Sequence, residues 1–112
     1  MLIGGYADVS WSGSSYTGNS NNFLFSLTQN YRIMHCTGQH SCGHPQYNHP
    51  AHGPTFGGGH DWYVNSGMTG GYCNLGYDYA CQVGSYGSSS CQNDFCGSYS
   101  SWTIQEFEVW GR

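Results

Sequence analysis

The stretch Gly53-Pro54-Thr55-Phe56-Gly57-Gly58-Gly59-His60-Asp61-Trp62-Tyr63-Val64 decides the fold, because a turn leads here directly into a strand. Pro54 fixes its own φ and biases the residue before it toward extended geometry. The three consecutive glycines permit positive φ and close approach of another backbone. The last three residues are strong strand formers. His60 and Asp61 therefore lie where a loop becomes rigid, a position that binding residues favour.

The glycine run has two further interpretations. Phosphate binding is disfavoured, since no Lys or Ser/Thr follows in P-loop register and no helix is predicted after it. The glycines could also serve only the close contact of two layers of structure.

The composition indicates one domain, residues 1–112, with a single core. Arg32 and Arg112 are the only basic residues, against six acidic ones. Without a basic patch, nucleic acid and anionic membranes are poor partners. No stretch is long and apolar enough to be inserted into a bilayer. A surface made of Ser, Asn, Thr, Gln, Gly and aromatic residues suits a neutral polar ligand.

The six cysteines predict disulfides and an oxidising compartment, so we expect a secreted, extracellular protein. No leader is visible, and the chain is interpreted as a mature or trimmed form. Spacing alone suggests local pairs, Cys36 with Cys42, Cys73 with Cys81 and Cys91 with Cys96. Zinc thiolates and free thiols remain alternatives.

Segments with strand character recur along the whole chain. They are residues 2–11, with a possible bulge at Gly4-Gly5, residues 22–27 as a central strand packed on both faces, residues 31–36 as its hairpin partner, residues 62–64, residues 72–79 and residues 101–110. Residues 84–97 are predicted to be an ordered loop held by cysteines. No segment shows a helical period over ten residues. The fold class predicted is therefore all-β, an antiparallel β-sandwich with disulfide-stapled loops.

Five of the six histidines lie between residues 35 and 52, interleaved with Cys36 and Cys42. This density favours zinc, but the spacing fits no zinc finger and no helix aligns the imidazoles. A solvated loop closed by a disulfide is the preferred interpretation, and no metal ligand is assigned.

Several motifs in order resemble the TLDc domain, the module of oxidation-resistance proteins. They are Ile3-Gly4-Gly5-Tyr6 with Trp11, Phe23 to Leu27, Gly53 to Asp61, Asn74-Leu75-Gly76 and Glu106 to Trp110. The resemblance implies a β-sandwich with flanking helices, and roles in oxidative-stress protection and binding to the vacuolar proton pump. It implies no catalytic residues. The chain departs from the family in lacking its N-terminal helices and in its six cysteines and His-rich insertion, which do not suit the family's intracellular roles.

The function predicted is a secreted lectin that binds glycans or glycoproteins, with a preference for galactose-type sugars. A sugar packs its C–H face on an aromatic ring, and its hydroxyls need planar polar partners. The ligand-binding candidates are His60, Asp61, Trp62, Asn74, Tyr77, Asp78, Trp11 and Tyr16. For the tryptophans, a place in the core is the competing interpretation.

Other functions remain open. The main alternative is a structural or interaction protein, of the matrix or an oxidative-stress scaffold, which binds no sugar and could form homo-oligomers through sheet edges. Catalysis is not predicted, since adjacent strand residues such as His60 and Asp61 point to opposite faces. Glu106 and Glu108 could form a carboxylate pair, but they also match the family's structural motif. No cofactor is expected, although calcium is possible at Asp61, Asp78 and Asn74.

Overall fold

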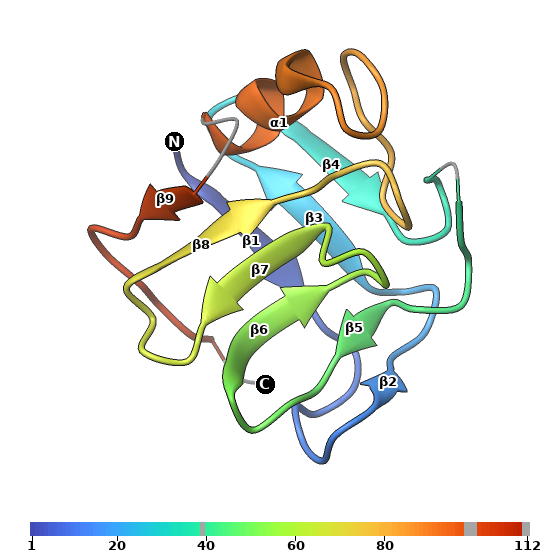
Figure 1. Ribbon diagram of the computed structural model, residues 1–112, viewed down its shortest axis with the longest axis vertical. Coiled ribbons are helices and arrows are strands. Elements are labelled where there is room, and N and C mark those ends of the chain that lie inside the picture. Colours follow the sequence, from blue (N-terminus) through green and yellow to red (C-terminus); the bar gives the residue numbers. More distant parts are fainter. Residues whose placement is uncertain (39, 98–100, 111–112) are drawn as a thin grey trace.

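A computed structural model describes residues 1–38, 40–97 and 101–110 of the chain (Figure 1). The elements run in the order β1 (Ile3–Tyr6), β2 (Tyr16–Thr17), β3 (Phe23–Ser26), β4 (Tyr31–Met34), β5 (Gln46–Tyr47), β6 (His52–Phe56), β7 (Trp62–Asn65), β8 (Gly70–Cys73), α1 (Ser89–Cys96) and β9 (Ser101–Thr103). All strand pairs are antiparallel. The prediction of a mostly antiparallel β protein is confirmed.

The smaller sheet has the order β1-β3-β4. As predicted, β3 is its central strand and forms a hairpin with β4, with Leu24 opposite Ile33. Both of these side chains are buried, whereas Phe23 and Phe25 alternate with them and are only half-buried. The expectation that both faces of this strand are packed is thus wrong for the outer face. The first strand is also shorter than the predicted residues 2–11 and ends at Tyr6.

The larger sheet has the order β2-β5-β6-β7-β8-β9. Trp62 and Val64 of β7 point toward the other sheet and are buried, while Tyr63 points away from it. The predicted strand over residues 62–64 is therefore confirmed. Between His52 and Thr55 the pairing of β6 with β7 changes register.

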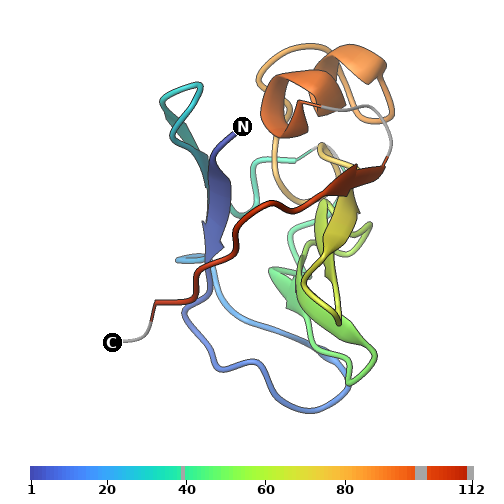
Figure 2. The same cartoon turned by 90° about the vertical axis from the view of Figure 1, so that its left-hand side faces the viewer.

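The core lies between the two sheets, which face each other in Figure 2. It contains Leu24 and Ile33 from one sheet and Phe56, Trp62 and Val64 from the other. At the top of Figure 1, α1 covers one end of this core. Among the described residues, no helix has the length and hydropathy needed to cross a membrane.

The helix α1 lies in a segment that we predicted to be a loop. Ser88 caps it, since the Ser88 side chain accepts a hydrogen bond from the N–H of Cys91. Gly97 ends it in the left-handed conformation, with φ of 72°. A helix of 8 residues is too short to show a period over ten residues, so the sequence pattern missed it.

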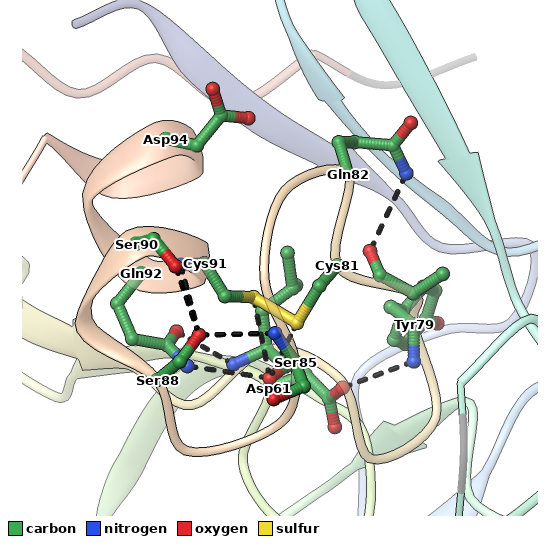
Figure 3. The surroundings of a disulfide bond; sticks show 12 residues. Asp61, Tyr79, Cys81, Gln82, Ser85, Ser88, Ser90, Cys91, Gln92 and Asp94 are labelled. Atoms are coloured by element: carbon green, nitrogen blue, oxygen red, sulfur yellow. Dashed lines mark hydrogen bonds between the residues drawn. A yellow bond between two sulfur atoms is a disulfide. The ribbon is translucent and has the colours of Figure 1, made fainter.

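The helix also changes the disulfide pairing. The predicted bond Cys36–Cys42 is present, but Cys73 pairs with Cys96 and Cys81 pairs with Cys91. Spacing failed because α1 turns its two cysteines toward different partners, one on β8 and one in the loop after it. Figure 3 shows Cys81–Cys91 beside Gln92, whose amide bonds both the N–H and the carbonyl of Leu75 at 2.8 and 3.3 Å.

The predicted closing strand over residues 101–110 is mostly extended chain without strand pairing. Only Ser101–Thr103 pairs with β8. Beyond it, Ile104 and Phe107 pack against the core, while Val109 and Trp110 are 79% and 86% exposed. Glu106 and Glu108 are exposed and lie outside any strand.

Candidate functional site

The turn at Gly57–His60 is held by two buried carboxylates. Asp61 Oδ2 accepts hydrogen bonds from the backbone N–H groups of Tyr77, Asp78 and Tyr79, each at 3.0 Å. Asp78 in return accepts a hydrogen bond from the N–H of Gly58. Two turns that are distant in the sequence are thereby joined, and the glycine turn gains a fixed position.

Burial dominates the electrostatics of this junction. Desolvation, and after it the charge of the neighbouring Asp78, raise the pKa of Asp61 to about 7, although the three N–H donors act in the opposite direction. Behind Asp78, His35 Nε2 lies 3.5 Å from its Oδ1 atom. Burial also lowers the pKa of His35, despite the attraction of Asp78. The junction is therefore a low-dielectric region that disfavours charge.

Three of the predicted ligand-binding residues have structural roles here. Asp61 and Asp78 are 0% exposed, and Trp62 is 7% exposed within the core. A ligand in solvent cannot reach these side chains, so the direct contacts that we predicted for them are replaced by support of the turn. The adjacent position, His60, is on the surface side of the same corner.

The structure also bears on the suggested metal ions. Cys36, Cys42 and the other cysteines are in disulfides, so their thiolates are not available to zinc. Within residues 1–38, 40–97 and 101–110, no group of three or more His, Cys, Asp or Glu side chains has the geometry to hold a metal ion. Asn74, the third residue suggested for calcium, donates its amide to the carbonyl of Gly59 at 3.1 Å.

The solvent-facing side of the larger sheet carries a line of rings, one from each of five neighbouring strands. These rings, which we call the aromatic row, are Tyr16 on β2, Tyr47 on β5, His52 on β6, Tyr63 on β7 and Tyr72 on β8. Successive ring centroids are 4.7, 5.5, 5.1 and 4.8 Å apart. The row thus crosses the sheet perpendicular to its strands.

Strand alternation explains why these rings share one face. Gln46, Trp62 and Cys73 point into the protein, so the residues next to them on each strand point outward. Cross-strand pairing then places Tyr16 opposite Tyr47, and Tyr63 opposite Tyr72. Such aromatic pairs stabilise the sheet by roughly 0.2–1 kcal/mol each.

His60 joins the aromatic row from the glycine turn. With φ of 55° its ring stacks on Tyr47 and Tyr63, at centroid distances of 5.5 and 5.8 Å. Its Nδ1 atom is 2.9 Å from the hydroxyl of Tyr72. The predicted residues His60 and Tyr16 therefore lie on the same surface, and the buried carboxylates position the turn that carries His60.

A pocket of about 490 Å³ adjoins the middle of the row. Trp11 forms part of its wall, together with Tyr47, His49 and His52. The Trp11 ring is 40% exposed and is anchored by an edge contact with buried Phe56 at 5.3 Å. Pro50, Pro54 and Met68 are among the other residues of a mostly apolar lining. Trp11, predicted from the sequence, is thus the tryptophan best placed to meet a ligand.

The remaining candidates lie on a separate group of rings. Tyr77 stacks on His40 at 5.5 Å and is tilted against Tyr86 at 5.8 Å. The Asn74 amide donates to the Tyr86 hydroxyl at 3.3 Å. Asn74 and Tyr77 are therefore brought together, but not with Trp11.

The aromatic row is uncharged at neutral pH. Burial lowers the pKa of His52 and of His60, and each also repels a neighbouring histidine, so both rings stay neutral. Burial raises the pKa of Tyr16 and of Tyr72, which keeps their hydroxyls protonated. The one arginine within the described residues, Arg32, lies over Phe23 of the smaller sheet. This face can offer hydrogen bonds and ring contacts, but the row has no charged side chain that could form an ion pair with a charged ligand.

Sequence reasoning found only one member of the aromatic row, Tyr16. Tyr47, Tyr63 and Tyr72 were missed as ligand contacts, although each follows or precedes an inward-pointing residue on a strand. The usable signal was that alternation. Alternation would identify the row only together with the order of the strands in the sheet, which the sequence does not show.

A two-sheet β fold with one short helix, three disulfides and an exposed aromatic face defines a small disulfide-linked β module. The family model of the TLDc domain matches residues 1–112, so the chain belongs to the TLDc family. The resemblance seen in its motifs is thereby confirmed. No curated protein and no solved structure matches the chain.

Proposed function

We propose that this TLDc domain is a non-catalytic module that binds neutral carbohydrates at the aromatic row and the adjoining pocket. One observation carries the proposal, namely a solvent-facing line of five rings, exposed at its two ends and half-buried between them, with no charged side chain among them. Protein surfaces that expose contiguous apolar area are usually interaction sites. The absence of charge favours a neutral partner.

The chemistry of the face matches that of a sugar. Tyrosine and tryptophan rings supply apolar area for the C–H side of a pyranose, and their polar groups supply hydrogen bonds. No hydrogen-bond partner is found within the described residues for the hydroxyls of Tyr47 and Tyr63, so both are available to a ligand. Tyr72 and His60 are already paired, which fixes their orientation before binding. Such preorganisation reduces the entropy lost on binding.

The proposal includes secretion of the protein. Three disulfides fit an oxidising, extracellular location, where glycans and glycoproteins are abundant. The preference for galactose is the finer part of the proposal, and it depends on stacking of the continuous apolar face of that sugar on Trp11.

A glycan array with the oxidised protein tests the proposal. We expect binding to neutral glycans, galactose-containing ones among them, that persists in the presence of a chelator. Trp11→Ala and Tyr47→Ala should each weaken binding about tenfold or more, since each removes a ring that lines the pocket. Tyr86→Ala, which removes a ring outside the row and pocket, is the matched control.

Circular dichroism and intact disulfides must show that each variant is folded. Absence of glycan binding by the folded wild-type protein would leave the alternative, an interaction or scaffold protein without sugar binding.

A further inference from the structure

The geometry of the aromatic row allows a statement about the shape of the ligand, which rests on the proposed function. Each of the strands β2, β5, β6, β7 and β8 contributes one ring, and the rings follow one another in the order of these strands in the sheet. A monosaccharide would contact only one or two of these rings. The remaining rings would then be exposed on a protein surface without a function in binding.

The repeat of the row is set by the sheet itself. Neighbouring strands lie about 4.7–4.9 Å apart, and the centroid steps from Tyr16 to Tyr72 are 4.7, 5.5, 5.1 and 4.8 Å. A pyranose unit linked equatorially at both ends lengthens a polysaccharide chain by an amount on the order of one such step. The row and an extended sugar chain therefore have similar repeats.

The orientation of the rings favours contact along the row. Tyr63 and Tyr72 stack with an interplanar angle of 28°, and Tyr16 and Tyr47 are tilted by 44°. In these two pairs the neighbouring faces partly cover each other, whereas His52 is inclined by 60° to Tyr47 and by 90° to Tyr63, so the row presents ring edges and polar groups as well as faces. Those groups include the hydroxyls of Tyr47 and Tyr63. A sugar chain lying across the strands would meet apolar edges and hydrogen-bonding groups in alternation.

The ends of the row are its most accessible parts. Tyr16 and Tyr72 are 41% and 37% exposed, whereas the three rings between them are half-buried. A ligand long enough to reach both ends gains contacts that a short one cannot make.

We propose that the row binds a linear neutral polysaccharide in extended form, with equatorial linkages of the β-1,4 type, whose chain runs across the strands from β2 to β8. About one sugar unit faces each ring, so the full site accommodates roughly four or five units. The ligand is thus a polymer chain, and a terminal sugar alone occupies only a fraction of the site.

Titration calorimetry with oligosaccharides of increasing length tests this arrangement. The probes are β-1,4-linked glucose, mannose and N-acetylglucosamine oligomers, all of which are linked equatorially at both ends, from the monosaccharide to the hexasaccharide. For the series that binds, we expect the association constant to rise roughly two- to tenfold per added unit, as for one aromatic contact, and to level off at about four or five units.

Variants at the two ends of the row provide the sharper test. Tyr16→Ala and Tyr72→Ala should each shorten by about one unit the length at which affinity levels off. Tyr86→Ala is again the control outside the row. Equal affinity for short and long oligomers in the wild-type protein, or an unchanged length profile in both folded end variants, overturns the extended arrangement.

The outcomes separate the two proposals. If a monosaccharide binds with full affinity and Trp11→Ala abolishes that binding, carbohydrate binding stands and the polymer site is rejected. If no oligomer of any length binds to the folded protein, the polymer site is rejected, and carbohydrate binding is rejected with it when the glycan array also shows no binding.

Discussion

Gly57 shows how one residue supports a surface that it does not touch. Its φ is 89°, and a Cβ atom there would overlap the carboxylate of Asp61. Because that carboxylate joins the turn at residues 57–60 to the turn at residues 77–79, the side chain cannot move away without breaking three hydrogen bonds. The glycine is therefore required twice, for its backbone conformation and for its lack of volume.

Gly57→Ala should destabilise the protein by about 3 kcal/mol or more, as backbone strain adds to a steric clash in the core. Gly87→Ala is the matched control, since Gly87 also has positive φ, 85°, but has open space around it. That change should cost only about 1–2 kcal/mol of strain. Urea unfolding of both variants measures the difference, and equal losses would mean that the contact with Asp61 is unimportant.

Asp61 should make the stability of the protein depend on pH. Its pKa is raised from 3.8 to about 7 in the folded state, so folding favours the neutral form. The contribution is fully present below the unfolded pKa and is lost as the pH rises through the folded one. Between about pH 5 and about pH 7 the loss amounts to about 2 kcal/mol.

Asp61→Asn has no proton to lose, so its stability should lack this component. We expect the free energy of unfolding of wild type to fall relative to that of the variant by about 2 kcal/mol from about pH 5 to about pH 7. The histidines His35, His52 and His60, whose pKa values are lowered, titrate in both proteins and cancel in the difference. A difference that is constant over this range would show that Asp61 is ionised throughout.

At the scale of elements, the disulfides that hold the helix and the one that holds an exposed loop close loops of different length. The disulfide Cys73–Cys96 joins β8 to the end of α1, and its cysteines have a sequence separation of 23. For Cys81–Cys91 the sequence separation is 10. The two cysteines of Cys36–Cys42 are exposed, and their sequence separation is only 6. A longer closed loop removes more entropy from the unfolded chain.

Removal of Cys73–Cys96 by a double alanine substitution should therefore cost about 3.5 kcal/mol, against about 2.4 kcal/mol for Cys36–Cys42. Denaturant unfolding of the two variants, each with the other disulfides intact, gives the comparison. The buried pair should cost still more than the entropic value, since its sulfur atoms are in the core. A larger loss from the exposed pair would contradict this order.

For the whole molecule, the separation of charge from the aromatic row is the property that matters. The chain has a formal net charge of −4, yet the row has no ionised group at neutral pH. Ligand binding through neutral groups should be nearly independent of ionic strength, because salt screens only charges.

Raising the salt concentration from about 0.01 M to about 1 M, which shortens the Debye length from about 30 to about 3 Å, should change glycan affinity less than about threefold. Calorimetric titration of one binding oligosaccharide at the two concentrations measures this. A fall of tenfold or more would indicate that charged groups outside the row contact the ligand.

Much of this protein follows from local patterns in its sequence. A continuous apolar run predicted β3, alternation predicted β4, and three strand-forming residues predicted β7. The cysteine content predicted disulfides, and the glycine turn before Trp62 predicted a rigid corner. Each of these depends on neighbours in the chain, through strand preference or through the freedom of glycine at positive φ. The TLDc motifs add the family, which the whole-chain match confirms.

Tertiary structure alone decided the pairing of cysteines in α1 and the burial of Asp61, Asp78 and Trp62. It also gathered Tyr16, Tyr47, His52, Tyr63 and Tyr72 on one face. These rings come from strands up to 56 positions apart, and they meet only because the sheet has the order β2-β5-β6-β7-β8. Residue type and local period determine which way a side chain points from its strand, whereas strand order determines which side chains become its neighbours.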